Sequence, residues 1–106
     1  MGLTAQPRIR LGTFPTPLQF AGRLTAQLGG PRIYIKRDDL TGLALGGNKT
    51  RMLEYLIADA LEHGATHLIT EGGPQSNHVR QTLAAARLAG LETVIVSNTT
   101  NPNPPV

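Results

Sequence analysis

A strand, a glycine turn, a helix and a second strand follow one another within about thirty residues, and this order constrains the fold more than any other feature of the sequence. Residues 67–70 and 93–96 are short runs of apolar and β-branched side chains, which are typical of strands. The segment between them begins with Gly72-Gly73-Pro74 and continues with apolar residues at helical spacing up to Gly90. The pattern predicts a βαβ unit with parallel strands, a right-handed crossover and a buried second strand. The fold class is therefore α/β.

Upstream of this unit, the sequence predicts a strand at residues 33–36, a glycine-rich loop at 42–47 and then a long helix. Asn48 is the expected N-cap of that helix, and His63-Gly64 suits its end because glycine accepts the left-handed conformation. Apolar positions recur on one face of the helix and charged positions on the other. The expected buried face consists of Leu53, Leu56, Ile57, Ala60 and Leu61, and the expected solvent face of Glu54, Asp59 and Glu62.

The chain ends, at residues 98–106, in a proline-containing tail without apolar periodicity, which we expect to be extended or disordered. A parallel sheet with so few strands leaves edges and faces that further chain normally covers. We therefore expect the sequence to be a truncated, leading part of a longer protein.

Composition and charge argue against several classes of protein. The chain has 106 residues, a net charge of +3 and no cysteine, so neither a disulfide nor a thiolate metal site is available. The arginines are scattered, which argues against nucleic acid as a partner. No apolar run has the length of a signal peptide or a membrane span, so we expect a cytoplasmic protein without a membrane partner. The three histidines lack the spacing of a zinc site, and we expect no metal.

Lysine is scarce, because Lys36 and Lys49 are the two that occur in the sequence. Lys49 follows Gly46-Gly47-Asn48 at the predicted start of the long helix, where two glycines let the backbone approach a ligand closely. A primary amine in that position is a candidate nucleophile for a carbonyl group. From spacing alone, a solvated lysine beside a helix cap remains the alternative.

Residues 42–50 come close to the phosphate loop of nucleoside triphosphatases, in which glycine directly precedes Lys-Thr. Here Asn48 separates Gly47 from Lys49, which would move the amine away from the phosphates. The strand predicted at 93–96 is also not followed by the aspartate that would hold magnesium. We therefore reject nucleotide hydrolysis.

A second candidate loop, Gly72 to His78, connects the end of a strand to the start of a helix, where open α/β sheets bind ligands. Free backbone N–H groups there can hold a carboxylate or phosphate, and Ser76, Asn77 and His78 add a hydroxyl, an amide and an imidazole. Simple helix capping by Ser76 or Asn77 is the alternative. Ser76 lacks the flanking glycines of a hydrolase nucleophile elbow.

Four segments, taken in order, resemble the D-cysteine desulfhydrase and 1-aminocyclopropane-1-carboxylate deaminase family. They are Pro15-Thr16-Pro17-Leu18, Ile35-Lys36-Arg37-Asp38-Asp39-Leu40-Thr41-Gly42, Gly46-Gly47-Asn48-Lys49-Thr50-Arg51 and Gln75-Ser76-Asn77-His78-Val79-Arg80-Gln81-Thr82. The resemblance implies a tryptophan synthase β-like fold (fold type II) with two α/β domains and a cofactor in the cleft between them. It places residues 1–52 in the larger domain and 53–97 at the start of the smaller one, with 98–106 as a tail.

By the same resemblance the cofactor is pyridoxal 5'-phosphate, and Lys49, with Asn48 beside it, is the lysine that carries it. Asn77 then hydrogen-bonds the ring oxygen of the cofactor. Ser76 handles the substrate carboxylate and a transferable proton, which makes Lys49 and Ser76 the catalytic pair. Gln75 and His78, together with Ser76 and Asn77, are the implied substrate contacts.

The activity implied by the resemblance is a lyase reaction that converts a small amino acid, D-cysteine, to pyruvate, sulfide and ammonia, in a homodimer at full length. His78 after Ser76-Asn77 favours this branch over the deaminase, which stays an alternative. Met52 departs from the family pattern, in which a second lysine helps to bind the cofactor's phosphate, and the family's later phosphate loop does not occur in these 106 residues. A non-catalytic ligand-binding or interaction module, or an inactive isolated chain, therefore also stays open.

Overall fold

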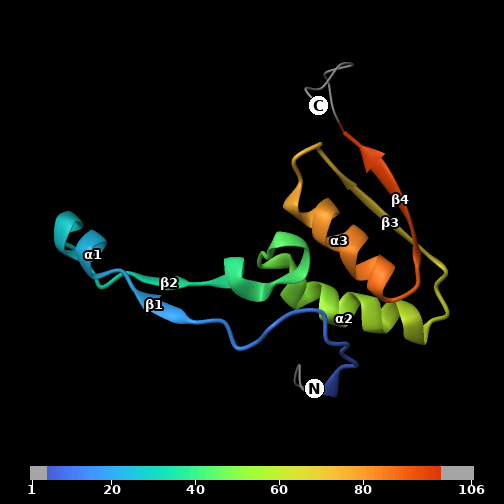
Figure 1. Ribbon diagram of the computed structural model, residues 1–106, viewed down its shortest axis with the longest axis horizontal. Helices are drawn as coiled ribbons and strands as arrows, with labels where there is room; N and C mark the ends of the chain where they lie inside the picture. Colours follow the sequence, from blue (N-terminus) through green and yellow to red (C-terminus); the bar gives the residue numbers. More distant parts are fainter. Residues whose placement is uncertain (1–4, 99–106) are drawn as a thin grey trace.

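A computed structural model describes residues 5–98, and Figure 1 shows a body from which an arm projects. The arm contains β1 (Leu18–Phe20), α1 (Gly22–Leu28) and β2 (Tyr34–Lys36). The body contains α2 (Lys49–Glu62), β3 (His67–Gly72), α3 (Asn77–Leu88) and β4 (Glu92–Ser97). Two short 3-10 helices, η2 (Asp38–Thr41) and η3 (Leu43–Leu45), connect the two parts. The predicted α/β class is confirmed.

The βαβ unit consists of β3, α3 and β4. The two strands are parallel, with His67 opposite Glu92 and Gly72 opposite Ser97, as predicted. The prediction that the second strand is buried was wrong, because Val94, Ile95 and Val96 are all exposed. Within the described part of the chain α3 packs against both strands, and the opposite face of this two-stranded sheet lies open.

The core lies between α2 and α3. Leu53 and Ile57 of α2 are buried against Ala85 and Ala86 of α3, and Leu43 and Leu91 complete the cluster. Burying one large aliphatic side chain stabilises a fold by about 1.5–3 kcal/mol, so this contact holds the two helices together. The start of α2 and the start of α3 are consequently fixed relative to each other.

Helix α2 ends where the sequence predicts, with Gly64 in the left-handed conformation at a φ of 71°. Its predicted faces are partly wrong. Glu54, expected in solvent, is 0% exposed, whereas Leu56 and Leu61 of the expected buried face are exposed. The reason for the burial of Glu54 is given with the site below.

The arm is an antiparallel pair of strands joined through α1. β2 lies within the predicted residues 33–36, and it pairs with β1 so that Phe20 lies opposite Tyr34, with ring centroids 5.2 Å apart. Neither β1 nor α1 was predicted from the sequence. Of the predicted tail at 98–106, residues 99–106 lie outside the described residues. The division into domains at residue 52 stays a prediction, and α2 runs through this position without a break.

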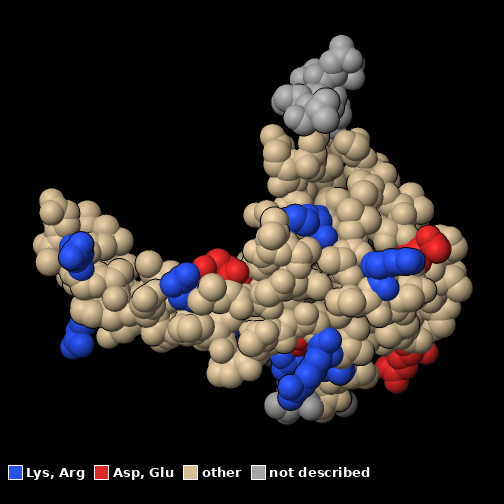
Figure 2. Space-filling model, in the orientation of Figure 1, with Lys and Arg blue, Asp and Glu red and all other residues tan. Residues whose placement is uncertain are grey.

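In the part of the chain that the structure describes, no helix combines the length and the apolar composition that crossing a membrane requires. On the face shown in Figure 2, lysine and arginine side chains are spread over the arm and the body instead of forming one stripe.

Candidate functional site

The turn before α2 brings Lys49 to the first position of the helix. Gly46 and Gly47 have φ values of 78° and 140°, which other residues rarely adopt. A Cβ atom on Gly46 would overlap the carbonyl oxygen of Asp39, and one on Gly47 would overlap the amide of Gln81. The two glycines therefore allow the turn to pack directly against the backbone of Asp39 and the side chain of Gln81.

The start of α2 is capped from α3. Asn48 is at the N-cap position, as predicted, but its side chain makes no capping hydrogen bond. Instead, Oε1 of the fully buried Gln81 accepts the backbone N–H of Thr50 at 2.9 Å and the Thr50 hydroxyl at 2.8 Å. Because Gln81 satisfies this N–H, a local cap is not needed there.

The second predicted loop ends at the N-terminus of α3. Oγ of Ser76 accepts the backbone N–H of Val79 at 3.3 Å, so Ser76 is the N-cap of α3. This bond uses a lone pair of Oγ and leaves the hydroxyl proton free to be donated. The N–H groups of Asn77 and His78 belong to the first helical turn, which has no intrahelical partners for them. This terminus therefore presents a hydroxyl and two N–H donors.

Two consecutive residues of α3 join the two loops. Nη2 of Arg80 donates to Oδ1 of Asn77 at 3.0 Å and to the carbonyl oxygen of Gly46 at 3.2 Å. Nε2 of Gln81 donates to the carbonyl oxygen of Asn77 at 3.2 Å, while its Oε1 holds Thr50. The structure thus brings the turn that carries Lys49 next to the turn that carries Ser76 and Asn77.

The remaining predicted residues are placed differently. The imidazole of His78 lines a cavity of about 130 Å³ between α2, β3 and α3. Its Nδ1, like the hydroxyls of Thr70 and Thr82 in the same cavity, is buried without a hydrogen-bond partner among residues 5–98. Ser76 lines a different pocket, beside Gly72 and Gly73, so the side chains of His78 and Ser76 diverge.

Asn48 and Gln75, the other two predicted residues, are exposed. For Gln75 and His78, contact with a substrate stays a prediction.

The donors of this site fit pyridoxal phosphate at two of its groups. An aldehyde requires a primary amine, and Nζ of the partly exposed Lys49 makes no hydrogen bond or ion pair within the described residues. A ring oxygen requires a donor, and Asn77 offers one because Arg80, which only donates, must face its Oδ1 and leaves Nδ2 free. Met52, which is exposed, adds no positive charge for the phosphate.

A network of polar and charged side chains supports the first turn of α2. The carboxylate of Asp38 accepts from Nε of Arg51 at 2.7 Å, from Nη2 of Arg51 at 2.8 Å and from the hydroxyl of Thr16 at 2.6 Å. These bonds, those from Arg51 above all, lower the pKa of Asp38 to about 2. The carboxylate therefore stays ionised and fixes Arg51, two residues after Lys49.

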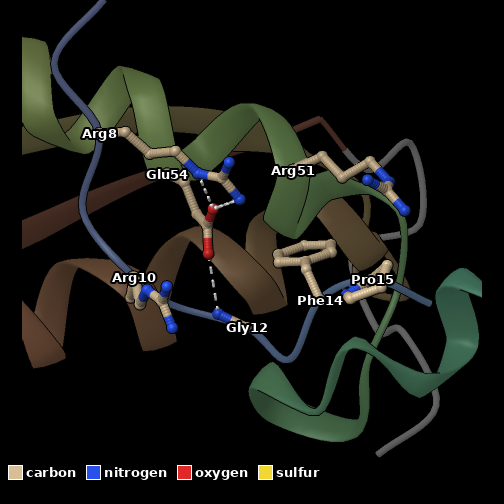
Figure 3. Close-up of a pocket in the computed structure, with 7 residues that line it drawn as sticks. All are labelled: Arg8, Arg10, Gly12, Phe14, Pro15, Arg51 and Glu54. Atoms are coloured by element: carbon tan, nitrogen blue, oxygen red, sulfur yellow. Dashed lines mark hydrogen bonds and ion pairs between the residues drawn. The ribbon is translucent and has the colours of Figure 1, made fainter. Parts of the chain in front are cut away.

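A separate pocket of about 490 Å³ lies over α2, and none of the predicted site residues lines it (Figure 3). Oε1 of Glu54 accepts the backbone N–H groups of Leu11 at 2.9 Å and Gly12 at 3.0 Å, and its Oε2 pairs with Arg8. These bonds explain why a carboxylate can be buried here. We assign this pocket to the packing of the N-terminal segment on α2.

Residues 9–105 match the sequence model of the family described as pyridoxal-phosphate dependent enzyme. The chain therefore belongs to the family of pyridoxal-phosphate dependent enzymes. The predicted cofactor is confirmed as that of the family.

The chain is also similar to individual members of this family. D-cysteine desulfhydrase of Salmonella paratyphi C (strain RKS4594) is 58% identical over 92 residues, which are 87% of this chain and 28% of that protein. D-cysteine desulfhydrase of Salmonella enteritidis PT4 (strain P125109) matches with the same identity and coverage. A solved structure of an ACC deaminase homologue has a TM-score of 0.82 and 46% identity, over 88% of this chain and 28% of that one.

The predicted resemblance and the fold type II architecture are confirmed by these matches. The chain spans 28% of the length of the relatives that it matches.

Proposed function

We propose that the protein is a pyridoxal-phosphate-dependent lyase that converts D-cysteine to pyruvate, sulfide and ammonia, and that this chain carries the lysine and the substrate loop of its site. The observation that carries the proposal is the junction made by Arg80 and Gln81, which joins the Lys49 turn to the Ser76–Asn77 turn. The 58% identity to D-cysteine desulfhydrases over 92 residues supports the choice of substrate. A cytoplasmic location and a homodimer belong to the same proposal.

Lys49 and Asn77 are the residues that we propose to hold the cofactor. The amine of Lys49 would bind its aldehyde carbon, and Nδ2 of Asn77 would donate to its ring oxygen. The exposed Asn48, which precedes Lys49 in the chain, is proposed as a further polar contact of the cofactor. When bound, the cofactor supplies an electron sink for the negative charge that develops at the substrate's α-carbon.

The N-terminus of α3 is the proposed site for the substrate's carboxylate. The N–H groups of Asn77 and His78 point along a helix whose N-terminal end is positive, which favours an anion. The hydroxyl of Ser76 keeps its proton free because Oγ already accepts from Val79, and it would donate that proton to the same carboxylate. Lys49 and Ser76 are the groups that we propose to move the α-proton.

A deaminase that acts on 1-aminocyclopropane-1-carboxylate is the second candidate, and the likeness to the ACC deaminase homologue favours it. The two activities differ in their products. Release of sulfide from D-cysteine supports the lyase, whereas release of ammonia from the cyclopropane substrate, without sulfide from D-cysteine, supports the deaminase.

The first test is attachment of the cofactor. We expect the purified chain, mixed with pyridoxal phosphate and reduced with borohydride, to carry the label at Lys49, and Lys49→Ala to lose both the label and the visible absorbance band. Lys36→Ala is the matched control, because Nζ of Lys36 already donates to the carbonyl oxygen of Thr16 at 2.6 Å. Equal labelling of both lysines, or none, would instead support a non-catalytic binding module.

A further inference from the structure

We propose that Arg80 and Gln81 form a bracket that sets the orientation of Lys49 and Asn77 relative to each other, and that they act as positioning residues for the cofactor. This inference rests on the proposed roles of Lys49 and Asn77. It adds Arg80 and Gln81 to the site, for which the sequence alone predicted no role.

The spacing along α3 makes the bracket possible. Asn77, Arg80 and Gln81 are related as i, i+3 and i+4, so their side chains lie on one face of the helix. Both later side chains reach back over the first turn, where Asn77 begins the helix. One turn of α3 therefore contacts both loops at once.

The Arg80 half of the bracket fixes the amide of Asn77. A guanidinium has only N–H groups to offer, so Nη2 must bind the oxygen of the Asn77 amide and not its nitrogen. Nδ2 of Asn77 therefore faces away from Arg80. Because Nδ2 is a hydrogen-bond donor, it is the atom of the amide that an oxygen of a ligand requires. The same Nη2 donates to the carbonyl oxygen of Gly46, so the amide is fixed with respect to the Lys49 turn.

The Gln81 half fixes the start of α2. Its Oε1 takes the N–H and the hydroxyl of Thr50, the residue directly after Lys49, and its Nε2 takes the carbonyl oxygen of Asn77. The backbone of Gly47 lies against the side-chain amide of Gln81, so closely that a Cβ atom on Gly47 would not fit. Because Gln81 is fully buried, no water replaces these bonds when the side chain is shortened or made apolar.

The test uses Arg80→Met and Gln81→Met, which keep unbranched side chains and remove the polar groups. Arg87→Met is the matched control, since Arg87 is an exposed arginine of the same helix. We expect Gln81→Met to speed hydrogen exchange of the Thr50 amide about tenfold, as the loss of one buried hydrogen bond would do, with exchange at Ile57 and Ala85 unchanged.

The second readout is the rate at which pyridoxal phosphate attaches to Lys49, trapped with borohydride. We expect both variants to attach the cofactor about tenfold more slowly than wild type and Arg87→Met. Arg80→Lys keeps a donor without the planar fork, so it should recover part of the rate. If a methionine variant fails to fold, Arg80→Lys, which keeps a donor, decides the same question.

Attachment at the wild-type rate in the folded variants, with an unchanged Thr50 amide, would overturn the bracket and leave the proposed function standing. A wild-type chain that takes up no cofactor at Lys49 would overturn the proposed function, and the positioning role with it. Slower attachment with uniformly faster exchange at Ile57 and Ala85 would mean general destabilisation, which also contradicts the inference.

Discussion

At the scale of single residues, the carboxylate of Asp38 connects the segment before the arm to the first turn of α2. It accepts from the hydroxyl of Thr16 and from two nitrogens of Arg51. Arg51 also lies over the ring of Phe14, at 4.7 Å from the ring centroid. Asp38 and Phe14 therefore fix the guanidinium of Arg51 from two sides. Because Arg51 lies in the first turn of α2, they also hold the turn that carries Lys49.

The lowered pKa of Asp38, about 2 against an ordinary 3.8, predicts a stability that depends on pH. In the unfolded chain Asp38 has its ordinary pKa, so as the pH falls it binds a proton there before it does so in the folded protein. The stabilisation by ionised Asp38 is therefore complete above about pH 4 and is lost as the pH falls to about 2. Arg51 is 42% exposed, and solvent screening limits the effect to at most about 2 kcal/mol. We expect the gap in unfolding free energy between wild type and Asp38→Asn, measured with urea, to close over this range.

Arg51→Met serves as the companion variant for this experiment, because it removes the first cause of the lowered pKa. It should lose part of the pH-dependent stability that Asp38→Asn loses, because the hydrogen bond from Thr16 still lowers the pKa of Asp38. A gap between wild type and Asp38→Asn that is equally large at about pH 6 and about pH 2 would contradict the assignment.

Glu54 shows why a residue's burial could not be read from the sequence. Its place among Asp59 and Glu62 on the charged side of α2 predicted a solvated side chain, since periodicity assigns faces by polarity. The structure instead lays Leu11 and Gly12 across this side of the helix, and their N–H groups bond to the carboxylate. These partners lie more than forty residues earlier in the chain, which no local pattern records.

At the scale of elements, the turn that precedes α2 depends on glycine for both conformation and space. Gly46 has a positive φ, and its Cα faces the carbonyl oxygen of Asp39 at a distance that excludes a side chain. Gly64, at the other end of α2, has a similar φ of 71° but open space where a Cβ would lie. At Gly46, whose φ of 78° and ψ of 174° lie in a region that essentially only glycine adopts, a side chain therefore meets both a conformational cost and an overlap, whereas at Gly64 it meets only a conformational cost.

We expect Gly64→Ala to lower the free energy of unfolding by about 1 kcal/mol, which is the cost of a left-handed alanine. Gly46→Ala should cost more than about 3 kcal/mol, because the backbone must also move away from Asp39. Urea unfolding of both variants measures the difference. Equal losses would show that the turn at Gly46 relaxes without strain and does not hold Lys49 in place.

The elements that the sequence predicted correctly are those with a local signal. α2, α3 and β3 have helical or strand periodicity and turn residues at their ends. β1 has only three residues and becomes a strand by pairing with β2, so it could not be predicted alone. The cap of α2 was missed for the same reason, because Gln81 lies 31 residues beyond Thr50.

At the scale of the whole molecule, one face of the β3–β4 sheet is uncovered within the described residues, and it has an apolar patch between the charged side chains of Glu71 and Glu92. Ile69 pairs with Val94, and Val96 follows Val94 on the same side of its strand. All three are exposed, Ile69 to 76%. Parallel sheets are normally covered on both faces, and the chain spans 28% of the length of its relatives.

This open face predicts how the 106-residue chain behaves when it is studied alone. We expect it to bind the dye ANS and to sediment as concentration-dependent assemblies, because the contiguous apolar surface gains from being covered. Ile69→Lys should reduce both effects by placing a charge at the centre of the face. Leu88→Lys is the control, since Leu88 is similarly exposed, at 68%, but lies at the end of α3 and away from the sheet. A wild-type chain that stays monomeric and binds no ANS would mean that this face is not available for association. Equal effects of the two substitutions would mean that any added surface charge reduces association, and that the sheet face is not responsible for it.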